Sequence, residues 1–299
     1  MDFNLLVILG PTASGKTKVG VKVAQALNGE IISADSRQVY RGMDIGTGKD
    51  LKEYGSVPYH LIDIVDPGYE FSVFEFQRLF FKTFTEIQKR GHLPNLVGGT
   101  GLYIDSVLRA YQMVEVPLNP ALRQELSSLS NEELAERLKK VNPKLHNTTD
   151  LLDRERLLRA IEISELGQNK NGPSFPEIRP LVFGIRWPRE ILKQRINLRL
   201  TERLRQGMVE EVERLQQKGI SLERLESYGL EYRFIAKYLK GELTFDEMEE
   251  KLRHAIHQFT KRQMTWFRRM ERMGINIHWV DGGADPAQAI LQIIENRRN

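Results

Sequence analysis

Cysteine is absent from the 299-residue sequence, which excludes disulfide bonds, thiolate catalysis and zinc sites built on cysteine. No apolar run reaches the roughly 18 residues of a membrane-spanning helix. The first residues lack the basic and apolar segments of a secretory signal. We therefore expect a cytoplasmic protein with no membrane partner. A hydrophobic content of 40% with 28% charged residues excludes a disordered or fibrous chain.

Acidic and basic residues nearly balance over the whole chain, with a net charge of +4, but their distribution is uneven. Residues 1–177 hold 21 basic and 23 acidic side chains, a net charge of −2, whereas residues 178–299 hold 23 and 17, a net charge of +6. Seven basic residues and one acidic residue lie between Lys251 and Arg272. This favours a polyanionic partner such as nucleic acid, although a solvated helix surface would have the same composition.

Short apolar runs alternate with amphipathic segments, the pattern of a parallel β-sheet covered by helices on both faces. We predict strands at residues 5–9, 30–33, 59–65, 93–97, 181–187 and 275–280. Helices are predicted at residues 16–27 and 71–90, in one amphipathic segment whose apolar stripe runs from Leu200 to Leu215, and from Pro286 onward. The pattern therefore predicts an α/β fold.

A different pattern interrupts this alternation after about Tyr111. Prolines punctuate the chain at 117 and 120, short helical patterns follow as far as Leu166, and residues 169–180 form a polar loop rich in proline. We interpret residues 113–178 as a helical insertion domain. Residues 1–112 and 179–299 would then form the α/β core domain with its C-terminal helices.

A phosphate-loop pattern, G-x-x-x-x-G-K-[ST], lies between the first predicted strand and helix, which is the context that the motif requires. It is matched by Gly10-Pro11-Thr12-Ala13-Ser14-Gly15-Lys16-Thr17. Its backbone N–H groups and the helix N-terminus would face an anion, Lys16 would add a full charge, and the Thr17 hydroxyl could ligate Mg²⁺. The default ligand is a nucleoside triphosphate, and the default function is that of a P-loop kinase or NTPase.

Two polar residues follow other predicted strands. Asp35 comes after the strand at 30–33, and Thr100 comes after the strand at 93–97. Because the C-terminal ends of parallel strands face the ligand crevice, both side chains should lie beside the phosphate loop. Asp35 could hold Mg²⁺ or act as a general base, and Thr100 could bind a phosphate oxygen. Alternatively, Asp35 caps a helix or shapes a turn, and Thr100 caps a helix.

These motifs occur in the order typical of the tRNA dimethylallyltransferase family (tRNA isopentenyltransferases), which the chain resembles over nearly its whole length. The resemblance rests on GPTASGKT (10–17), ISADSRQVYRGMDIGTGK (32–49), HLIDIVDP (60–67), FSVFEF (71–76), LVGGTGLYI (96–104), RLLRAIEI (156–163) and KRQMTWFRR (261–269). The phosphate loop alone is moderately specific, but the motifs together are highly specific. The chain resembles the bacterial type, because the zinc finger of eukaryotic members needs cysteine.

The resemblance reassigns the phosphate loop from ATP to the diphosphate of dimethylallyl diphosphate. The implied reaction transfers a dimethylallyl group to the exocyclic amine of the adenosine at tRNA position 37, just 3′ of the anticodon, and releases diphosphate. Mg²⁺ is the implied cofactor, with Thr17 as its ligand. Lys16 and Arg199 would stabilise the leaving diphosphate, Asp35 would be the general base, and Thr100 would contact the substrates at the reacting centre. We expect the chain to act as a monomer.

The resemblance also implies a set of tRNA-binding residues, which would contact phosphates and read a target adenine flipped out of its stack. They are Asp35, Ser36, Arg37, Gln38, Thr100, Arg123, Arg156, Arg159, Tyr232, Arg233, Lys261, Arg262, Arg268 and Arg269. Two residues depart from the family pattern: Glu231 stands where glycine is common, and Glu155 where arginine is usual. We expect Trp266 and Phe267 to be core residues.

Three other functions are compatible with parts of this pattern. They are an adenylate isopentenyltransferase that uses free AMP, ADP or ATP, a kinase of a small metabolite, and a non-catalytic RNA-binding protein. The helical insertion and the basic C-terminal segment favour tRNA over a mononucleotide as the acceptor. The presence of Lys16, Thr17, Asp35 and Thr100 argues against a non-catalytic protein.

Overall fold

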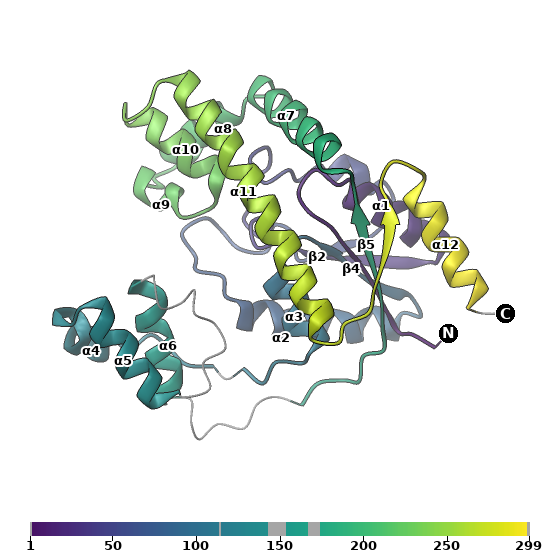
Figure 1. Cartoon of the computed structure of the whole chain (residues 1–299), viewed down its shortest axis with the longest axis horizontal. Helices are drawn as coiled ribbons and strands as arrows, with labels where there is room; N and C mark the ends of the chain where they lie inside the picture. Colours follow the sequence, from purple (N-terminus) through teal and green to yellow (C-terminus); the bar gives the residue numbers. More distant parts are fainter. Residues whose placement is uncertain (1, 114, 143–153, 167–173, 298–299) are drawn as a thin grey trace. The chain divides into compact units, whose positions relative to one another are not determined.

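The computed structural model describes residues 2–113, 115–142, 154–166 and 174–297 (Figure 1). The chain divides into two compact units. The larger is Met1–Ala110 with Pro176–Asn299, and the smaller is Tyr111–Phe175, which overlaps the segment interpreted as a helical insertion. Among the described residues, no helix has the length and apolar character needed to cross a membrane.

The larger unit is built on a six-stranded sheet in which all paired strands are parallel. The strand order is β3-β2-β4-β1-β5-β6, with β1 (Leu5–Leu9), β2 (Gly29–Ala34), β3 (Tyr59–His60), β4 (Leu93–Gly98), β5 (Pro180–Arg186) and β6 (Ile277–Asp281). Every residue of β1, β2 and β4 is buried, as expected of strands covered on both faces. The predicted α/β fold is confirmed.

Helices cover both faces of this sheet (Figure 1). One group contains α1 (Lys16–Ala26) and α12 (Pro286–Asn296), with the short helix η1 (Leu51–Tyr54) against α1. The other contains α2 (Val73–Lys89), α3 (Gly101–Leu108) and α11 (Phe245–Arg272). Fully buried Leu6 and Ile8 of β1 pack in one cluster with Val23 of α1 and Ile290 of α12. Each such side chain contributes about 1.5–3 kcal/mol by leaving water.

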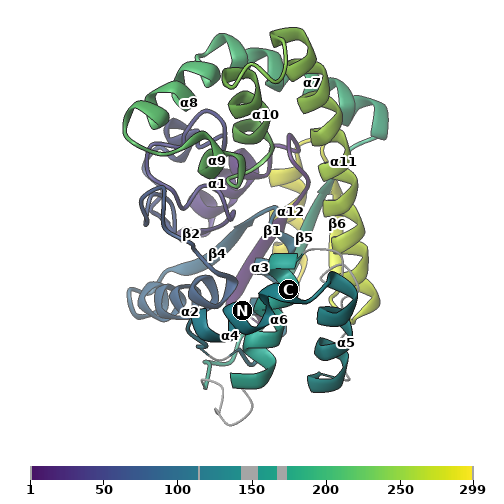
Figure 2. The ribbon, with the colours of Figure 1, turned by 90° about the vertical axis from the view of Figure 1, so that its left-hand side faces the viewer.

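A second core lies beyond the C-terminal ends of the strands. It is formed by α7 (Arg189–Arg205), α8 (Met208–Gln217), α9 (Leu222–Glu226), α10 (Leu230–Leu239) and the first half of α11. Ala13 of the phosphate loop and Val39 and Tyr40, which follow β2, belong to the same cluster. Figure 2 shows these helices gathered beyond one end of the sheet. They therefore pack directly against the loops that carry the predicted site.

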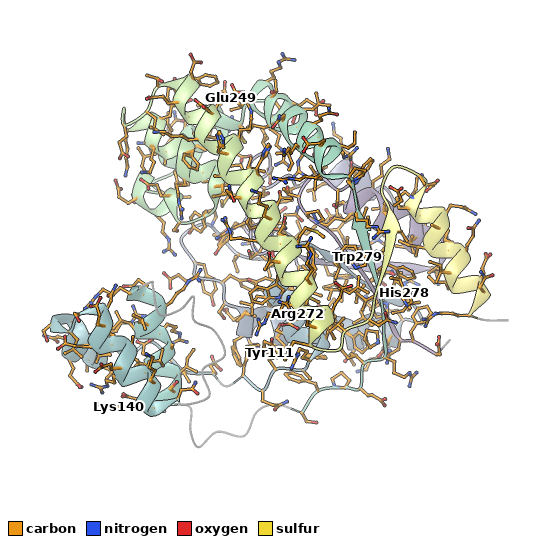
Figure 3. All side chains as sticks on the ribbon, in the orientation of Figure 1. Tyr111, Lys140, Glu249, Arg272, His278 and Trp279 are labelled. Carbon is orange, nitrogen blue, oxygen red and sulfur yellow. The ribbon has the colours of Figure 1, made fainter. Side chains whose placement is uncertain are left out.

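Helix α11 extends from this second core to the helices that cover the sheet. Figure 3 marks Glu249 near its start and Arg272 at its end. At that end, Trp279 of β6 donates a hydrogen bond from Nε1 to Glu271 (2.8 Å) and packs against Phe267, which is fully buried. The expectation that Phe267 is a core residue is confirmed.

The smaller unit is helical in its described part. It contains α4 (Pro120–Glu125), the short helix η2 (Leu126–Ser128), α5 (Asn131–Val141) and α6 (Arg154–Leu166). Its core is a leucine-rich cluster that includes Leu126, Leu134, Leu138 and Leu157, all fully buried. No strand occurs in 115–142, 154–166 or 174–175, in keeping with the helical pattern of the sequence.

Two predicted elements differ in the structure. The strand predicted at 59–65 ends at His60, because Leu61 and Asp63 adopt positive φ angles of 62° and 54°, which a strand does not allow. The single helix predicted across Leu200–Leu215 is two helices, α7 and α8. They are separated at Gly207, whose φ of 94° favours glycine and ends a right-handed helix.

Candidate active site

The phosphate loop connects β1, the third strand from one edge of the sheet, to the start of α1. Two of its carbonyl oxygens are bound by donors from α7 and from the residue that follows β5. Arg195 Nε donates to Ala13 O (2.9 Å), and Trp187 Nε1 donates to Ser14 O (3.0 Å). The Arg195 guanidinium also stacks over the Trp187 ring at 4.2 Å. These bonds engage carbonyls that would otherwise repel a phosphate, so the loop is prepared to present its N–H groups to an anion.

Gln263 of α11 ties the phosphate loop to the loop after β4. Its Oε1 accepts a hydrogen bond from Thr12 N (2.9 Å), and its Nε2 donates to Gly99 O (2.9 Å). The side chain is buried, so both bonds are shielded from water and fix the spacing of the two loops. The helix whose exposed face carries the predicted tRNA-binding residues therefore also shapes the anion site.

Lys16 is the principal cation of the loop. Burial, together with nearby Arg199 and Arg203, lowers the pKa of its amine to about 8, and Asp35 partly offsets this effect. The low pKa means that the charge of Lys16 is poorly compensated in this structure. An anion bound beside Lys16 would raise this pKa, so the amine is set to respond to a phosphate ligand.

Two arginines of α7 face the same site. A Cβ at Gly48 would lie 1.5 Å from Arg203 Nη2 and 2.5 Å from Arg199 Nη2, so both guanidinium groups rest on the bare backbone of this glycine. Gly48 also has a φ of 67°, which L side chains rarely adopt. Burial and mutual repulsion lower the pKa of Arg199 to about 10, and burial lowers the pKa of Arg203. Arg199 thus lies close to the phosphate loop and Lys16, and its role as a diphosphate clamp stays a prediction.

These arginines form one wall of a pocket against the phosphate loop. The pocket is lined by Thr12, Ala13, Ile196, Arg199, Leu200, Arg203, Glu231 and Ile256. Guanidinium groups and aliphatic side chains share this lining. Such a wall suits a ligand that carries an anionic group beside an apolar group.

Glu211 of α8 holds the loop that carries Gly48. Its buried carboxylate accepts hydrogen bonds from three consecutive backbone amides, those of Asp44 (2.8 Å), Ile45 (2.7 Å) and Gly46 (3.0 Å), and from the Tyr232 hydroxyl (2.7 Å). Tyr232 is 1% exposed. The Tyr232 hydroxyl is thus used to hold Glu211, and contact of this residue with tRNA stays a prediction.

Asp35 and Thr100 lie side by side at the ends of β2 and β4. Ser36 N donates to Thr100 Oγ1 (3.1 Å), and Thr100 N donates to Ala34 O (3.1 Å). Thr100 is the N-cap residue of α3, but its side chain makes no capping hydrogen bond and accepts from Ser36 N instead. Asp35 does shape a turn, because one carboxylate oxygen, Oδ1, accepts from Arg37 N (2.9 Å). This turn fixes the orientation of the carboxylate beside the cations.

The two residues after Ser36 differ in exposure. Arg37 is partly exposed and packs beside Gly229 at the start of α10. Gln38 is buried, accepts a hydrogen bond from Ser33 Oγ (3.1 Å) and donates one to Gly48 O (3.2 Å). In this structure Gln38 therefore supports the Gly48 loop rather than presenting its amide to a partner.

The predicted tRNA-binding residues of α11 lie on its solvent side. Lys261, Arg262 and Arg268 are exposed and are referred to below as the α11 basic surface. Arg269 is partly covered and stacks over the Trp266 ring at 5.2 Å. Trp266 in turn lies against Gly101, next to Thr100, so this surface begins close to the candidate site. Arg233 of α10 is also exposed.

The predicted tRNA-binding arginines of the smaller unit have internal partners. The carboxylate of Glu162, fully buried in α6, binds Arg123 Nε (2.8 Å) and Arg159 Nη1 (3.0 Å). Glu155 adds an ion pair to Arg123 (2.9 Å), and Arg156 is exposed. Glu155, which stands where arginine is usual in the family, thus helps to hold Arg123 in place.

Thr17 is the second residue of α1, and its side chain is partly buried. In the described part of the chain, no group of three or more His, Cys, Asp or Glu side chains could hold a metal ion. Mg²⁺ in phosphate sites takes one or two protein ligands and completes its shell with water and substrate oxygens. A single hydroxyl at the end of a phosphate loop fits such a site.

Sequence reasoning missed three residues of this region: Arg203, Glu211 and Gln263. A signal for Arg203 was present, since Arg195, Arg199 and Arg203 recur every fourth residue and so share one face of α7. Glu211 and Gln263 gave no signal, because one acid or amide on an amphipathic helix is normally a surface residue.

The fold and site define a phosphate-loop α/β enzyme for a substrate with linked phosphates. Family models match over most of the chain: IPP transferase at residues 38–270 and Isopentenyl transferase at residues 3–55. The chain therefore belongs to the IPP transferase family, that of the tRNA dimethylallyltransferases, and is a prenyl-transferring enzyme. The family resemblance predicted from the motifs is confirmed.

Individual proteins of this family are similar to the chain over nearly its whole length. The chain is 64% identical to tRNA dimethylallyltransferase 1 of Geotalea uraniireducens, over 98% of each chain. It is 62% identical to tRNA dimethylallyltransferase 2 of Syntrophotalea carbinolica, over 98% of this chain and 99% of the relative. Among solved structures, it is similar to the tRNA isopentenylpyrophosphate transferase of Bacillus halodurans, with a TM-score of 0.71 and 36% identity over 97% of this chain and 94% of the other.

Proposed function

We propose that this protein transfers a dimethylallyl group from dimethylallyl diphosphate to the exocyclic amine of adenosine 37 in tRNA and releases diphosphate. The observation that carries the proposal is the cationic pocket formed by the phosphate loop, Lys16, Arg199 and Arg203, in a chain so similar to tRNA dimethylallyltransferases. The aliphatic side chains in the same pocket suit the prenyl group of the donor.

Stabilisation of the leaving group is the first task of the site. When the C1–O bond of the donor breaks, its electron pair stays on the diphosphate, which gains negative charge. Preorganised N–H groups of the phosphate loop, with Lys16, Arg199 and Arg203, would stabilise that charge more in the transition state than in the bound donor. Mg²⁺ bound through Thr17 would supply further positive charge to the same oxygens.

Activation of the acceptor is the second task. The amine of adenine is a weak nucleophile until it loses a proton as the new N–C bond forms. Asp35 would accept this proton, because its carboxylate is fixed by Arg37 N and follows β2 directly into the crevice. Thr100, bound to Ser36 N, would position the amine or the departing oxygen beside Asp35.

The tRNA would be held by exposed basic residues. The α11 basic surface is the best-supported part of this interface, because its side chains are accessible and begin near Thr100. Arg37, Arg233 and Arg156 are further exposed or partly exposed candidates, and the helical insertion (113–178) is proposed to contact tRNA as well. A monomeric state stays a prediction.

The direct test incubates purified protein with dimethylallyl diphosphate, Mg²⁺ and an unmodified tRNA, followed by nucleoside analysis by mass spectrometry. We expect isopentenyladenosine from this tRNA and none from a transcript with guanosine at position 37. Parallel reactions replace the tRNA with AMP, ADP or ATP. Faster prenylation of a free nucleotide would show an adenylate isopentenyltransferase, and transfer of phosphate from ATP without a prenyl donor would show a kinase.

A further inference from the structure

One anionic side chain lines the cationic pocket. Glu231 is the second residue of α10, and its Oε1 lies 4.0 Å from Arg203 Nη1. The side chain is 23% exposed and shares the pocket with Arg199 and with Thr12 and Ala13 of the phosphate loop. A carboxylate is the wrong charge for a site that binds diphosphate, so its position there calls for an explanation.

Charged groups from several elements surround Glu231. Arg203 and Arg199 of α7 favour its ionised form, whereas Asp35, after β2, opposes it. Tyr232, its neighbour on α10, has its hydroxyl bound to Glu211. Burial raises the pKa of Glu231 above its ordinary value, against the effect of the two arginines. Burial and the two arginines therefore act on the pKa of this carboxyl group in opposite directions.

Glu231 satisfies its arginine partner only in part. The ion pair with Arg203 is at the limit of contact, and Arg203 Nη2 is buried with no hydrogen-bond partner among the described residues. A buried guanidinium N–H without a partner is costly. Arg203 also lines the pocket, so Glu231 and an anion bound there would share the same guanidinium group.

We propose that Glu231 is a built-in counter-anion that competes with the diphosphate of the donor for Arg199 and Arg203, and so sets the affinity of this pocket. The inference rests on the proposed function, because it needs a diphosphate in the pocket. In the free enzyme Glu231 compensates part of the charge of Arg199 and Arg203. Once diphosphate binds, the carboxyl group takes up a proton or turns away from the arginines. The same competition speeds release of the diphosphate product.

The test measures binding of inorganic diphosphate and of dimethylallyl diphosphate by calorimetry, with Mg²⁺ present, from about pH 5 to about pH 8. The variants are Glu231→Gln, which keeps the shape of the side chain, and Glu231→Ala, which removes it. Glu250→Gln is the matched control, since it removes one exposed carboxylate of α11 outside the pocket. Thermal unfolding of each variant verifies that it is folded.

We expect Glu231→Gln to bind both ligands about tenfold more tightly than the wild type near pH 8, the effect of one opposing charge. The difference should shrink as the pH falls, because a protonated Glu231 resembles glutamine. Glu231→Ala should show the same trend, and Glu250→Gln should match the wild type. Diphosphate should also inhibit prenyl transfer more strongly in Glu231→Gln.

Two results would overturn this role. Weaker binding by both variants at every pH would show that Glu231 is needed to hold Arg203 in place. A ratio to wild type that stays at one across the pH range would show that Glu231 does not compete with the ligand. If the folded wild type bound neither ligand at any pH, the proposed donor site itself would be wrong, which is a separate outcome.

Discussion

Replacing Lys16 by methionine should weaken diphosphate binding in a way that depends strongly on pH. The substitution keeps the length of the side chain and removes its charge. A hydrogen bond from a charged group contributes about 2 kcal/mol, so we expect an affinity about 30-fold lower than that of the wild type at pH 7.

The pKa of Lys16 sets how this difference changes with pH. With a pKa of about 8, roughly nine-tenths of the lysine is charged at pH 7 and roughly one-tenth at pH 9. Because the pKa of the free enzyme is lowered, the charge is lost as the pH rises through 8, and diphosphate binding must then be accompanied by proton uptake. The advantage of the wild type over Lys16→Met should therefore fall about tenfold between pH 7 and pH 9.

Calorimetric titration with inorganic diphosphate at three pH values measures this ratio directly. Comparing two proteins at each pH cancels the ionisation of the ligand and of residues that both retain. Lys18→Met is the matched control, because Lys18 is an exposed lysine of the same helix, and its ratio to wild type should not change with pH. A Lys16→Met ratio that is constant from pH 7 to pH 9 would refute the link between burial of Lys16 and anion binding.

Three further outcomes are expected. Asp35→Asn should lower prenyl transfer by about 10²–10⁴ with little change in tRNA affinity, because it removes a proton acceptor and keeps the shape; undiminished turnover would exclude Asp35 as the base. Replacing all three residues of the α11 basic surface by alanine should reduce the slope of log Kd for tRNA against log salt by roughly 2, whereas Lys218→Ala, an exposed change on the α8 side, should leave it unaltered. Glu211→Gln should cost about 2–4 kcal/mol of unfolding free energy in urea titrations, because one carboxylate oxygen becomes an N–H₂ group that faces at least one of the three backbone N–H donors; wild-type stability would contradict that account.

The positions of the strands could be predicted from the sequence because β1, β2 and β4 are buried on both faces. Strands buried in this way consist of runs of apolar residues, which the sequence shows directly. The break at Gly207 could not be read in the same way. The apolar period of the chain continues from Leu200 through Met208 to Leu215, and it is the positive φ of Gly207 that divides the helix. The spacing of apolar residues indicates which side of a helix faces the core. It does not indicate where one helix ends and another begins in a new direction.

The candidate site was predictable to the extent that its residues belong to local motifs. The phosphate loop has a fixed spacing, and Asp35 and Thr100 follow strands whose ends must meet. Tyr232 and Gln38 have buried hydrogen-bond partners that only tertiary packing defines, so their predicted contact with tRNA could not be weighed against a structural role from sequence. The placement of Glu231 beside Arg203 depends on how the C-terminal helices pack into one core and was beyond any local pattern.

The hydrogen bond from Thr12 N to Gln263 spans 251 positions of the chain. A ribosome that has made the sheet strands β1 to β4 has not yet made the residue that fixes the phosphate loop. During synthesis the growing polypeptide would thus contain a recognisable phosphate-loop sequence without a finished binding site. Maturation of the site is tied to the emergence of α11, so fragments that stop short of this helix should be poor starting points for engineering a smaller enzyme.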